Sequence, residues 1–545
     1  MAPPTAGAAG QSGGARAGRR NGRAAVTDDG EAAGKRPGRD RAASDRAAGG
    51  RAAGGRATSG RADLARRAAV DVLRGVDERD AYANLLLPAL LRERGLSGRD
   101  AALATELSYG TLRGQGSYDA ILAICSDRDL ASIDPPLRQV LRLGAHQLLA
   151  TRVRPHAAVA TSVDLARYVA GPRPAGFVNA VLRRVATRDL AAWLDIAAPA
   201  RADDLIGHLS VRYSHPRWIV TALSAALGEQ EASGLPETEA ALAADGERPA
   251  VTLCAIPGQA ERGELVAVGC EPARWSEFGA YLAAGDPADV AAVAQSRASV
   301  QDEASQLAAV ALARADTAGA DRGRWLDVCA GPGGKARLLA GLAAERGARL
   351  LAADAREHRA RLVLTALRGA AAAEPGPPDA GRSEPGPPEP GAGIATPGPP
   401  AVITADGTAP AWRPGSFDRV LADVPCSGLG ALRRRPEARW RRSPQDVAGL
   451  TSLQCRLLTT ALDSARPGGV VAYVTCSPHL SETRDVVTAV LAGRSDIEVL
   501  DAPAVLAEVP GLRCPDPDRR FAQFWPHRHG TDAIFLALLR RSLRA

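Results

Sequence analysis

Residues 325–335 read Trp-Leu-Asp-Val-Cys-Ala-Gly-Pro-Gly-Gly-Lys, and this stretch decides the fold of the larger part of the chain. The apolar run 325–328 is typical of a buried parallel strand, and the glycines after it predict a tight turn into a helix. Such a turn lets a ligand approach the backbone closely, and the helix N-terminus favours anionic or polar groups. The turn is not a Walker A loop, because Cys329 stands where that motif needs Gly and Ala336 where it needs Ser or Thr.

Four more short apolar runs follow, with helical stretches between most of them, at 349–353, 401–403, 417–421 and 469–474. This alternation predicts a doubly wound, Rossmann-like α/β sheet over residues 301–545. Residues 371–400 interrupt it with a Pro- and Gly-rich stretch in which EPGPP occurs twice, and we expect a solvated, disordered insert there.

Acids and thiols stand at the ends of these runs, where open α/β sheets bind their ligands. Asp354 follows the second run, about 20 residues past the glycine turn, where an acid can accept hydrogen bonds from ribose hydroxyls. A helix N-cap is the alternative role, but the strand, turn and spaced acid together favour a nucleoside-containing cofactor. Cys426 and Cys476 follow the fourth and fifth runs, in ADVPCSGLG and VTCSP, without the partner set of a zinc site.

The part of the chain before residue 301 has a different character. Residues 61–190 predict a compact bundle of helices, one of which starts at Asp134-Pro135-Pro136. Residues 205–300 mix helices and short strands, and we interpret them as a small α+β segment. Residues 1–60 contain almost no large apolar side chain, and we expect a disordered basic tail.

Length and composition exclude several classes of protein. The 545 residues exceed one domain, and no run of 18 apolar residues predicts a membrane span. No secretory signal is expected, so the eight Cys should be reduced thiols in the cytoplasm. Residues 1–60 hold 11 basic and 5 acidic residues, which accounts for six of the seven net positive charges. Residues 61–545 therefore carry almost no net charge, and if they bind nucleic acid they must do so through local basic patches.

One basic patch stands out downstream of Cys426. Residues 433–442 contain six Arg together with Trp440, and we interpret them as an RNA backbone clamp beside the site, with a solvated basic helix as the alternative. His527 and His529 are expected to serve the fold or RNA contacts rather than catalysis. The six arginines are Arg433, Arg434, Arg435, Arg439, Arg441 and Arg442.

The motifs CAGPGGK, ADVPCSGLG and VTCSP, with Glu482 downstream, resemble those of the Sun/Nop RNA cytosine-5 methyltransferases. The ending PHRHGTDAIFLALL (526–539) is similar to that family's closing strand. The segments 82–85, 106–111, 141–149 and 176–184 resemble the NusB-like RNA-binding domain. The resemblance to the NusB-like domain narrows the family to those members that act on 16S rRNA of the small ribosomal subunit.

The resemblance implies S-adenosylmethionine as the cofactor and RNA, most of all 16S rRNA, as the partner. It implies that Asp354 holds the ribose, that Asp406 lies beside the adenine and that Asp423 lies beside the methionine end. It further implies Cys476 as the nucleophile that adds to cytosine carbon 6 and Cys426 as the residue that helps release the product. Asp423 or Lys335 could also polarise the base. The cofactor loop would comprise Cys329, Ala330, Gly331, Pro332, Gly333, Gly334 and Lys335.

Other functions stay open on the sequence alone. The same motifs could methylate cytosine in tRNA or another RNA, or remain in a non-catalytic RNA-binding assembly factor. A DNA cytosine methyltransferase would use the Cys of its Pro-Cys motif as the nucleophile and would not require Cys476. The helical region disfavours DNA. We expect a monomer with no metal, no membrane partner and no DNA partner.

Overall fold

The computed structural model describes residues 52–371, 398–514 and 520–543. Most of the predicted tail (1–51) and of the predicted insert (372–397) lies outside these ranges. Helix α1 (Ala52–Arg79) begins before residue 60, inside the segment predicted as a tail, and the boundary at residue 60 stays a prediction.

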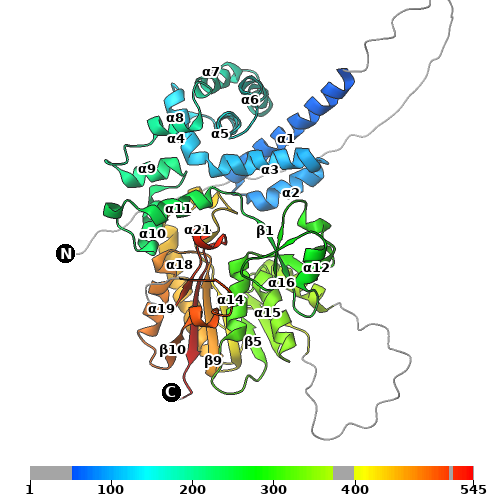
Figure 1. Cartoon of the computed structure of the whole chain (residues 1–545), viewed down its shortest axis with the longest axis vertical. Helices are drawn as coiled ribbons and strands as arrows, with labels where there is room; N and C mark the ends of the chain where they lie inside the picture. Colours follow the sequence, from blue (N-terminus) through cyan, green and yellow to red (C-terminus); the bar gives the residue numbers. More distant parts are fainter. Residues whose placement is uncertain (1–51, 372–397, 515–519, 544–545) are drawn as a thin grey trace, which may run out of the picture. The chain divides into compact units, whose positions relative to one another are not determined.

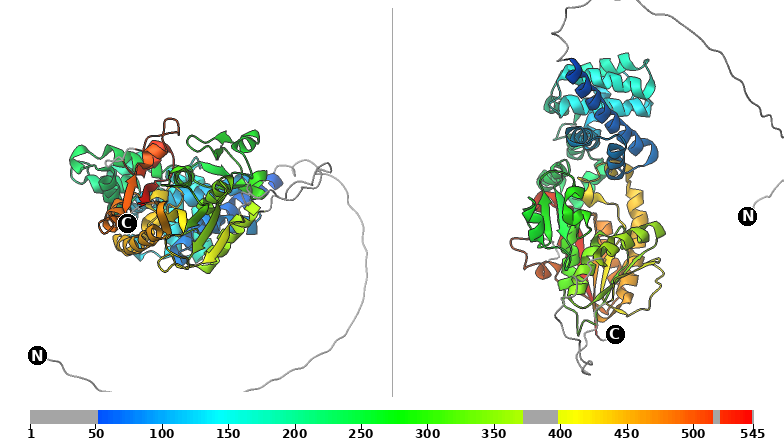
Figure 2. Two further views of the ribbon diagram at one scale, coloured as in Figure 1. Left: turned by 90° about the horizontal axis from the view of Figure 1, so that it is seen from below. Right: turned by 90° about the vertical axis from the view of Figure 1, so that its right-hand side faces the viewer.

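The first region is entirely helical, as the sequence predicts. Helix α5 starts at the predicted Asp134-Pro135 signal, with Asp134 as its N-cap residue. Apolar faces of α1 to α7 share one buried core, and Figure 2 shows α1, in dark blue, running across the bundle. The other helices are α2 (Ala83–Glu93), α3 (Gly98–Arg113), α4 (Gln115–Cys125), α5 (Pro135–Leu149), α6 (Pro155–Ala170), α7 (Ala175–Val185) and α8 (Leu190–Ala197).

The second region joins five α-helices to a small sheet, which agrees with the mixed α+β interpretation of 205–300. Its sheet has the order β2-β3-β1-β4, and all its pairs are antiparallel. That this region is a separate domain stays a prediction. Its elements are α9 (Leu205–Arg212), α10 (Arg217–Leu227), α11 (Pro236–Asp245), β1 (Val251–Ala255), α12 (Arg262–Ala267), β2 (Glu271–Pro272), β3 (Gly279–Leu282), α13 (Ala291–Ala294) and β4 (Ala298–Val300).

The third region is the predicted doubly wound sheet, in the order β10-β12-β9-β8-β5-β6-β7. The five predicted strands pair in parallel, whereas β12 pairs antiparallel with both β9 and β10. Because β5 lies between β6 and β8, the chain reverses direction across the sheet at β5, which makes a topological switch point there. The strands are β5 (Arg324–Asp327), β6 (Arg349–Asp354), β7 (Ala401–Thr404), β8 (Phe417–Asp423), β9 (Ala465–Thr475), β10 (Ile497–Leu500), β11 (Ala522–Gln523) and β12 (Phe535–Arg541).

Helices cover both faces of this sheet (Figure 1). Successive side chains along a strand point to opposite faces, so Trp325 packs in the core under α14 and α15, while Leu326 packs in the core under α18. Burial on both faces explains why these strands are continuous apolar runs. The helices are α14 (Glu303–Arg314), α15 (Gly334–Glu345), α16 (Glu357–Ala371), α17 (Ala438–Arg441), α18 (Pro444–Ser464), α19 (Arg484–Leu491), α20 (Ala502–Val505) and α21 (Pro526–His529).

Candidate active site

The glycine turn joins β5 to α15 at the switch point, as the sequence predicts. Gly333 has φ +115°, a conformation that L side chains rarely adopt, and a Cβ there would lie 2.9 Å from Ala366 Cβ. At Gly331 an added Cβ would collide with the carboxylate of Asp354. The glycines are therefore required by the close packing of the turn against β6 and α16.

Asp354 lies at the end of β6 and is buried. Its carboxylate accepts hydrogen bonds from the backbone N–H groups of Gly331 (3.1 Å) and Arg356 (2.9 Å), and it lies 3.3 Å from Arg359 Nε. It thus links the glycine turn to the next strand. Asp406 is exposed after β7 and accepts hydrogen bonds from the backbone and hydroxyl of Thr408, which lower the pKa of its carboxyl.

The two thiols meet at the ends of neighbouring strands. Cys476 follows β9, Cys426 follows β8, and their sulfur atoms lie 3.2 Å apart. Their pKa values shift in opposite directions. The hydrogen bond from Cys426 lowers the pKa of the Cys476 thiol, as does the positive charge of Lys335. The same hydrogen bond, together with burial, raises the pKa of Cys426. Cys476 is therefore the better thiolate of the pair.

A second charged pair joins the glycine turn to the Pro-Cys motif. Lys335 Nζ lies 3.0 Å from Asp423 Oδ2, at the end of β8. Although burial opposes its charge, the pKa of Lys335 is raised by Asp423 and by the neighbouring Cys476. Lys335 is therefore a fixed positive charge beside the thiols and not a solvated lysine. That it polarises the base stays a prediction.

Asp327, the last residue of β5, is a member of this cluster that sequence analysis missed. It is fully buried, its Oδ1 accepts the backbone N–H of Cys329, and its Oδ2 has no hydrogen-bond partner among the described residues. Burial, together with nearby Asp423, raises its pKa to about 8. The signal was present in the sequence, because Asp327 interrupts an apolar strand directly before the glycine turn.

Glu482 fixes the Pro-Cys motif through hydrogen bonds to Ser427, the residue after Cys426. This buried carboxylate accepts hydrogen bonds from the backbone N–H (2.7 Å) and the hydroxyl of Ser427, and from Gln454 Nε2 (3.1 Å). The backbone N–H of Gly430 donates to the carbonyl of Cys476 (2.9 Å). Side-chain and backbone hydrogen bonds thus couple the two Cys motifs and fix the short distance between the sulfur atoms.

A cavity of about 530 Å³ opens beside these groups. Of the predicted site residues, Ala330, Gly331, Pro332, Gly334, Lys335 and Asp423 line it. The remaining predicted residues of the described chain, namely Cys329, Gly333, Asp354, Asp406, Cys426 and Cys476, are not in its lining. Helix α3 supplies another part of the wall, so the helical region contributes directly to the site.

The arginine segment 433–442 is mostly not the RNA clamp that the sequence predicts. Arg439 is buried and donates to the carbonyls of Arg113, Ser214 and Asp245 (2.6–3.2 Å). Arg441 donates to the carbonyls of Val76 and Ala81. Burial lowers the pKa of Arg439 to about 10. These two arginines join the helical region to the sheet region, because buried backbone carbonyls at the junction need donors.

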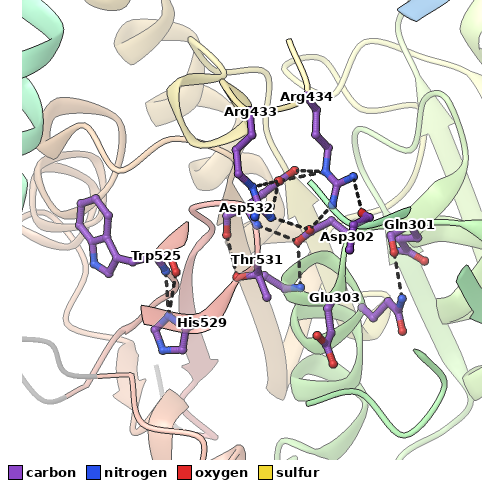
Figure 3. A network of polar contacts seen from close by, with 12 residues as sticks. Gln301, Asp302, Glu303, Arg433, Arg434, Trp525, His529, Thr531 and Asp532 are labelled. Carbon is purple, nitrogen blue, oxygen red and sulfur yellow. Dashed lines mark hydrogen bonds and ion pairs between the residues drawn. The ribbon is translucent and has the colours of Figure 1, made fainter. Parts of the chain in front are cut away.

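Two further arginines of the segment are paired with carboxylates (Figure 3). Arg434 lies 2.7 Å from Asp302 and 3.0 Å from Asp532, and Arg433 lies 3.3 Å from Asp532. Burial, with Asp302 nearby, raises the pKa of Asp532 to about 6.

The two histidines serve the fold, as expected. His529 Nδ1 accepts the backbone N–H of Trp525 within the core (2.9 Å), and His527 lies 2.8 Å from Glu237. In the described ranges, no group of three His, Cys, Asp or Glu side chains forms a metal site, and every helix is too short or too polar to cross a membrane.

The switch-point glycine turn, the acid after the second strand and the strand order define an S-adenosylmethionine-dependent methyltransferase of the Rossmann-like class. The residues present fit this cofactor. The turn brings bare backbone to the cavity wall, and the carboxylate of Asp423 lies in the same wall, where it can face the positive charge of a sulfonium. The chain belongs to the 16S rRNA methyltransferase RsmB/F family, whose model matches residues 317–373 and 399–540. The NusB family matches residues 63–187, which confirms the resemblance of the helical region.

Individual relatives agree with this assignment. The chain is 49% identical over 481 residues to the putative methyltransferase Rv1407 of Mycobacterium tuberculosis, covering 88% of this chain and 97% of that protein. It is 31% identical to the ribosomal RNA small subunit methyltransferase B of Pseudomonas putida, covering 87% and 98%. The crystal structure of PH0851 shares the fold, with a TM-score of 0.67 at 20% identity, covering 88% of this chain and 99% of that one.

Proposed function

We propose that this methyltransferase modifies carbon 5 of a cytosine in small-subunit (16S) rRNA through a covalent adduct with Cys476. The observation that carries the proposal is the thiol pair, with sulfur atoms 3.2 Å apart and pKa values displaced in opposite directions. A single nucleophile would need no second thiol at this distance. Two thiols with different proton affinities suit a reaction in which one attacks and the other acts later.

Carbon 5 of cytosine is a poor nucleophile, and addition of a thiolate to carbon 6 overcomes this. The Cys476 thiolate forms the sulfur–carbon bond, and the electron pair of the 5,6 double bond becomes available at carbon 5. We assign to Asp423 the hydrogen bond to the cytosine ring. The ring nitrogen takes up a proton that passes from the ammonium of Lys335 through Asp423, and it returns this proton when Cys476 leaves. S-adenosylmethionine, held by the glycine turn, Asp354 and Asp406, supplies the methyl group.

Release requires that carbon 5 lose its proton and that the bond between sulfur and carbon 6 break. In the free protein the hydrogen bond with Cys476 raises the pKa of Cys426 most, and burial raises it further. Once Cys476 is bonded to carbon 6, Cys426 no longer donates its hydrogen bond to a thiolate. This cause of its raised pKa is then removed, while burial remains, so Cys426 gives up its thiol proton more readily. Cys426 then becomes able to take the carbon 5 proton, so that the double bond reforms and the Cys476 thiolate leaves.

The roles of the two thiols are distinguished by incubating each variant with RNA and labelled cofactor and analysing the product on a denaturing gel. Cys476→Ala should be inactive and form no adduct, whereas Cys426→Ala should accumulate a protein–RNA adduct that carries the methyl group. Cys455→Ala, a half-buried thiol on α18, should behave as wild type. An adduct with Cys476→Ala but none with Cys426→Ala would reverse the roles.

The substrate is tested by methyl transfer to small-subunit rRNA, tRNA and DNA, followed by bisulfite sequencing of the product. Protection at one cytosine of small-subunit rRNA is expected. Preferential labelling of tRNA or DNA would refute the rRNA assignment, and no transfer to any of them would favour a non-catalytic assembly factor.

A further inference from the structure

The cavity beside the thiols carries more positive than negative charge. Its lining contains six basic and four acidic side chains. Three of the basic groups are neutralised within the wall, since Lys335 pairs with Asp423, and Arg433 and Arg434 share two carboxylates. The excess therefore resides in the three basic groups that remain.

These three are Arg113, Arg248 and Arg435, and none has an ion pair with a carboxylate in the part of the chain that the structure describes. Arg113 packs 5.7 Å from the ring centroid of Tyr109, and Arg435 packs 5.8 Å from that of Tyr82. Arg113 and Arg248 interact electrostatically with Glu106 and lower the pKa of its carboxyl, but neither forms an ion pair with it among the described residues. The Glu106 carboxylate lies 3.6 Å from His146 Nε2.

The three side chains come from distant parts of the sequence and meet at one cavity. Arg113 ends helix α3 of the helical region, Arg248 precedes β1, and Arg435 follows the Pro-Cys motif. The buried Arg439 donates a hydrogen bond of 3.0 Å to the carbonyl of Arg113, and so fixes the backbone that carries this guanidinium. Arg435 is close enough to the thiols to lower the pKa of Cys476.

We propose that Arg113, Arg248 and Arg435 bind the phosphates that flank the target cytidine. This inference rests on the proposed function. The cofactor brings one carboxylate together with positive groups, so it does not need three guanidiniums. A nucleotide turned out of its stack into a cavity must instead be held by the backbone on either side. Guanidiniums match phosphate oxygens in charge and geometry.

The test measures RNA binding rather than turnover. Each arginine is changed to Gln in a Cys476→Ala background, and the affinity for a transcript of small-subunit rRNA is measured from 50 to 200 mM KCl. Each lost contact should reduce the slope of log K against log salt by about 0.7–0.9 and weaken binding about fivefold at 150 mM salt. The triple variant should lose about a hundredfold, while S-adenosylmethionine affinity by calorimetry stays unchanged.

Two further variants control the measurement. Arg99→Gln removes an exposed arginine at the other end of α3 and should leave the slope unchanged. Arg113→Lys keeps the charge and should preserve the slope, which separates a lost contact from a misfolded helix.

Wild-type slopes in the three Gln variants would overturn the inference, as would an equal effect of Arg99→Gln or a loss confined to S-adenosylmethionine affinity. If the wild-type protein fails to methylate cytosine while the slopes fall as expected, the proposed function fails and the phosphate site stands.

Discussion

Replacing Glu482 should show how much of the site depends on a carboxylate that never reaches the cavity. In Glu482→Ala, the buried N–H of Ser427 loses its acceptor, and Gln454 keeps only the carbonyl of Pro425 (2.9 Å). The hydroxyl of Ser427 can still turn to Ser477 (3.1 Å). The unpaired N–H donor and the lost charge-assisted hydrogen bond lower the free energy of unfolding. Because the variant no longer buries a charge, part of this loss is offset, and the net loss is about 3 kcal/mol.

Differential scanning calorimetry measures this cost. For a domain of this size, about 3 kcal/mol corresponds to a fall in Tm of about 6–12 °C. Glu482→Gln keeps an oxygen for the Ser427 N–H and should lose only about 1 kcal/mol. Methyl transfer should fall in the Ala variant more than cofactor affinity does, because Ser427 adjoins Cys426 while the glycine turn is untouched.

Glu498→Ala serves as the control, because Glu498 is half exposed and, within the part of the chain that the structure describes, forms an ion pair only with Arg540. It should leave Tm nearly unchanged, since exposed ion pairs contribute little. A Tm for Glu482→Ala within 2 °C of the wild type, taken roughly as 1 kcal/mol or less, would refute the reasoning that this carboxylate supports the Pro-Cys motif.

Three other perturbations test the rest of the site. Asp354→Ala should weaken S-adenosylmethionine binding by about 1.5–3 kcal/mol in calorimetry, because the turn loses an acceptor with a full charge; unchanged affinity would contradict the ribose assignment. Lys335→Met should move the pH midpoint of Cys476 alkylation by iodoacetamide upward, because the thiolate loses a nearby positive charge. Asp423→Asn should move this midpoint downward, because a negative charge that repels the thiolate is removed. Shifts of the same sign would count against the pair. Arg439→Met should leave three buried carbonyls without donors, cost about 3 kcal/mol and speed proteolysis at the junction of the two regions; wild-type resistance would show that other contacts join them.

Sequence analysis predicted most of the local structure correctly, because each signal lies within a few residues. Apolar runs buried on both faces gave the five parallel strands, and the Asp134-Pro135 signal placed the start of α5. The glycines of the turn were recognised for the same reason, since they directly follow an apolar run and allow a tight turn into a helix. Their close approach to Asp354 became visible only in the structure. Cys426 and Cys476 were placed at strand ends by spacing alone.

What sequence by itself could not decide is which charges meet. The six arginines of 433–442 form one basic run in the sequence, but tertiary packing gives five of them different partners. Arg439 and Arg441 donate to backbone carbonyls outside the sheet region, Arg433 and Arg434 pair with buried carboxylates, and Arg435 lines the cavity without such a pair among the described residues. Likewise the position of Asp327 is visible in the sequence, but its raised pKa is not, because it arises only when folding buries the carboxyl beside Asp423. Hydrophobic periodicity and turn signals depend on residues that are close together in the sequence, so they can be recognised without the structure. Partners for charged groups come from segments hundreds of residues apart, and only the folded chain brings them within hydrogen-bonding distance.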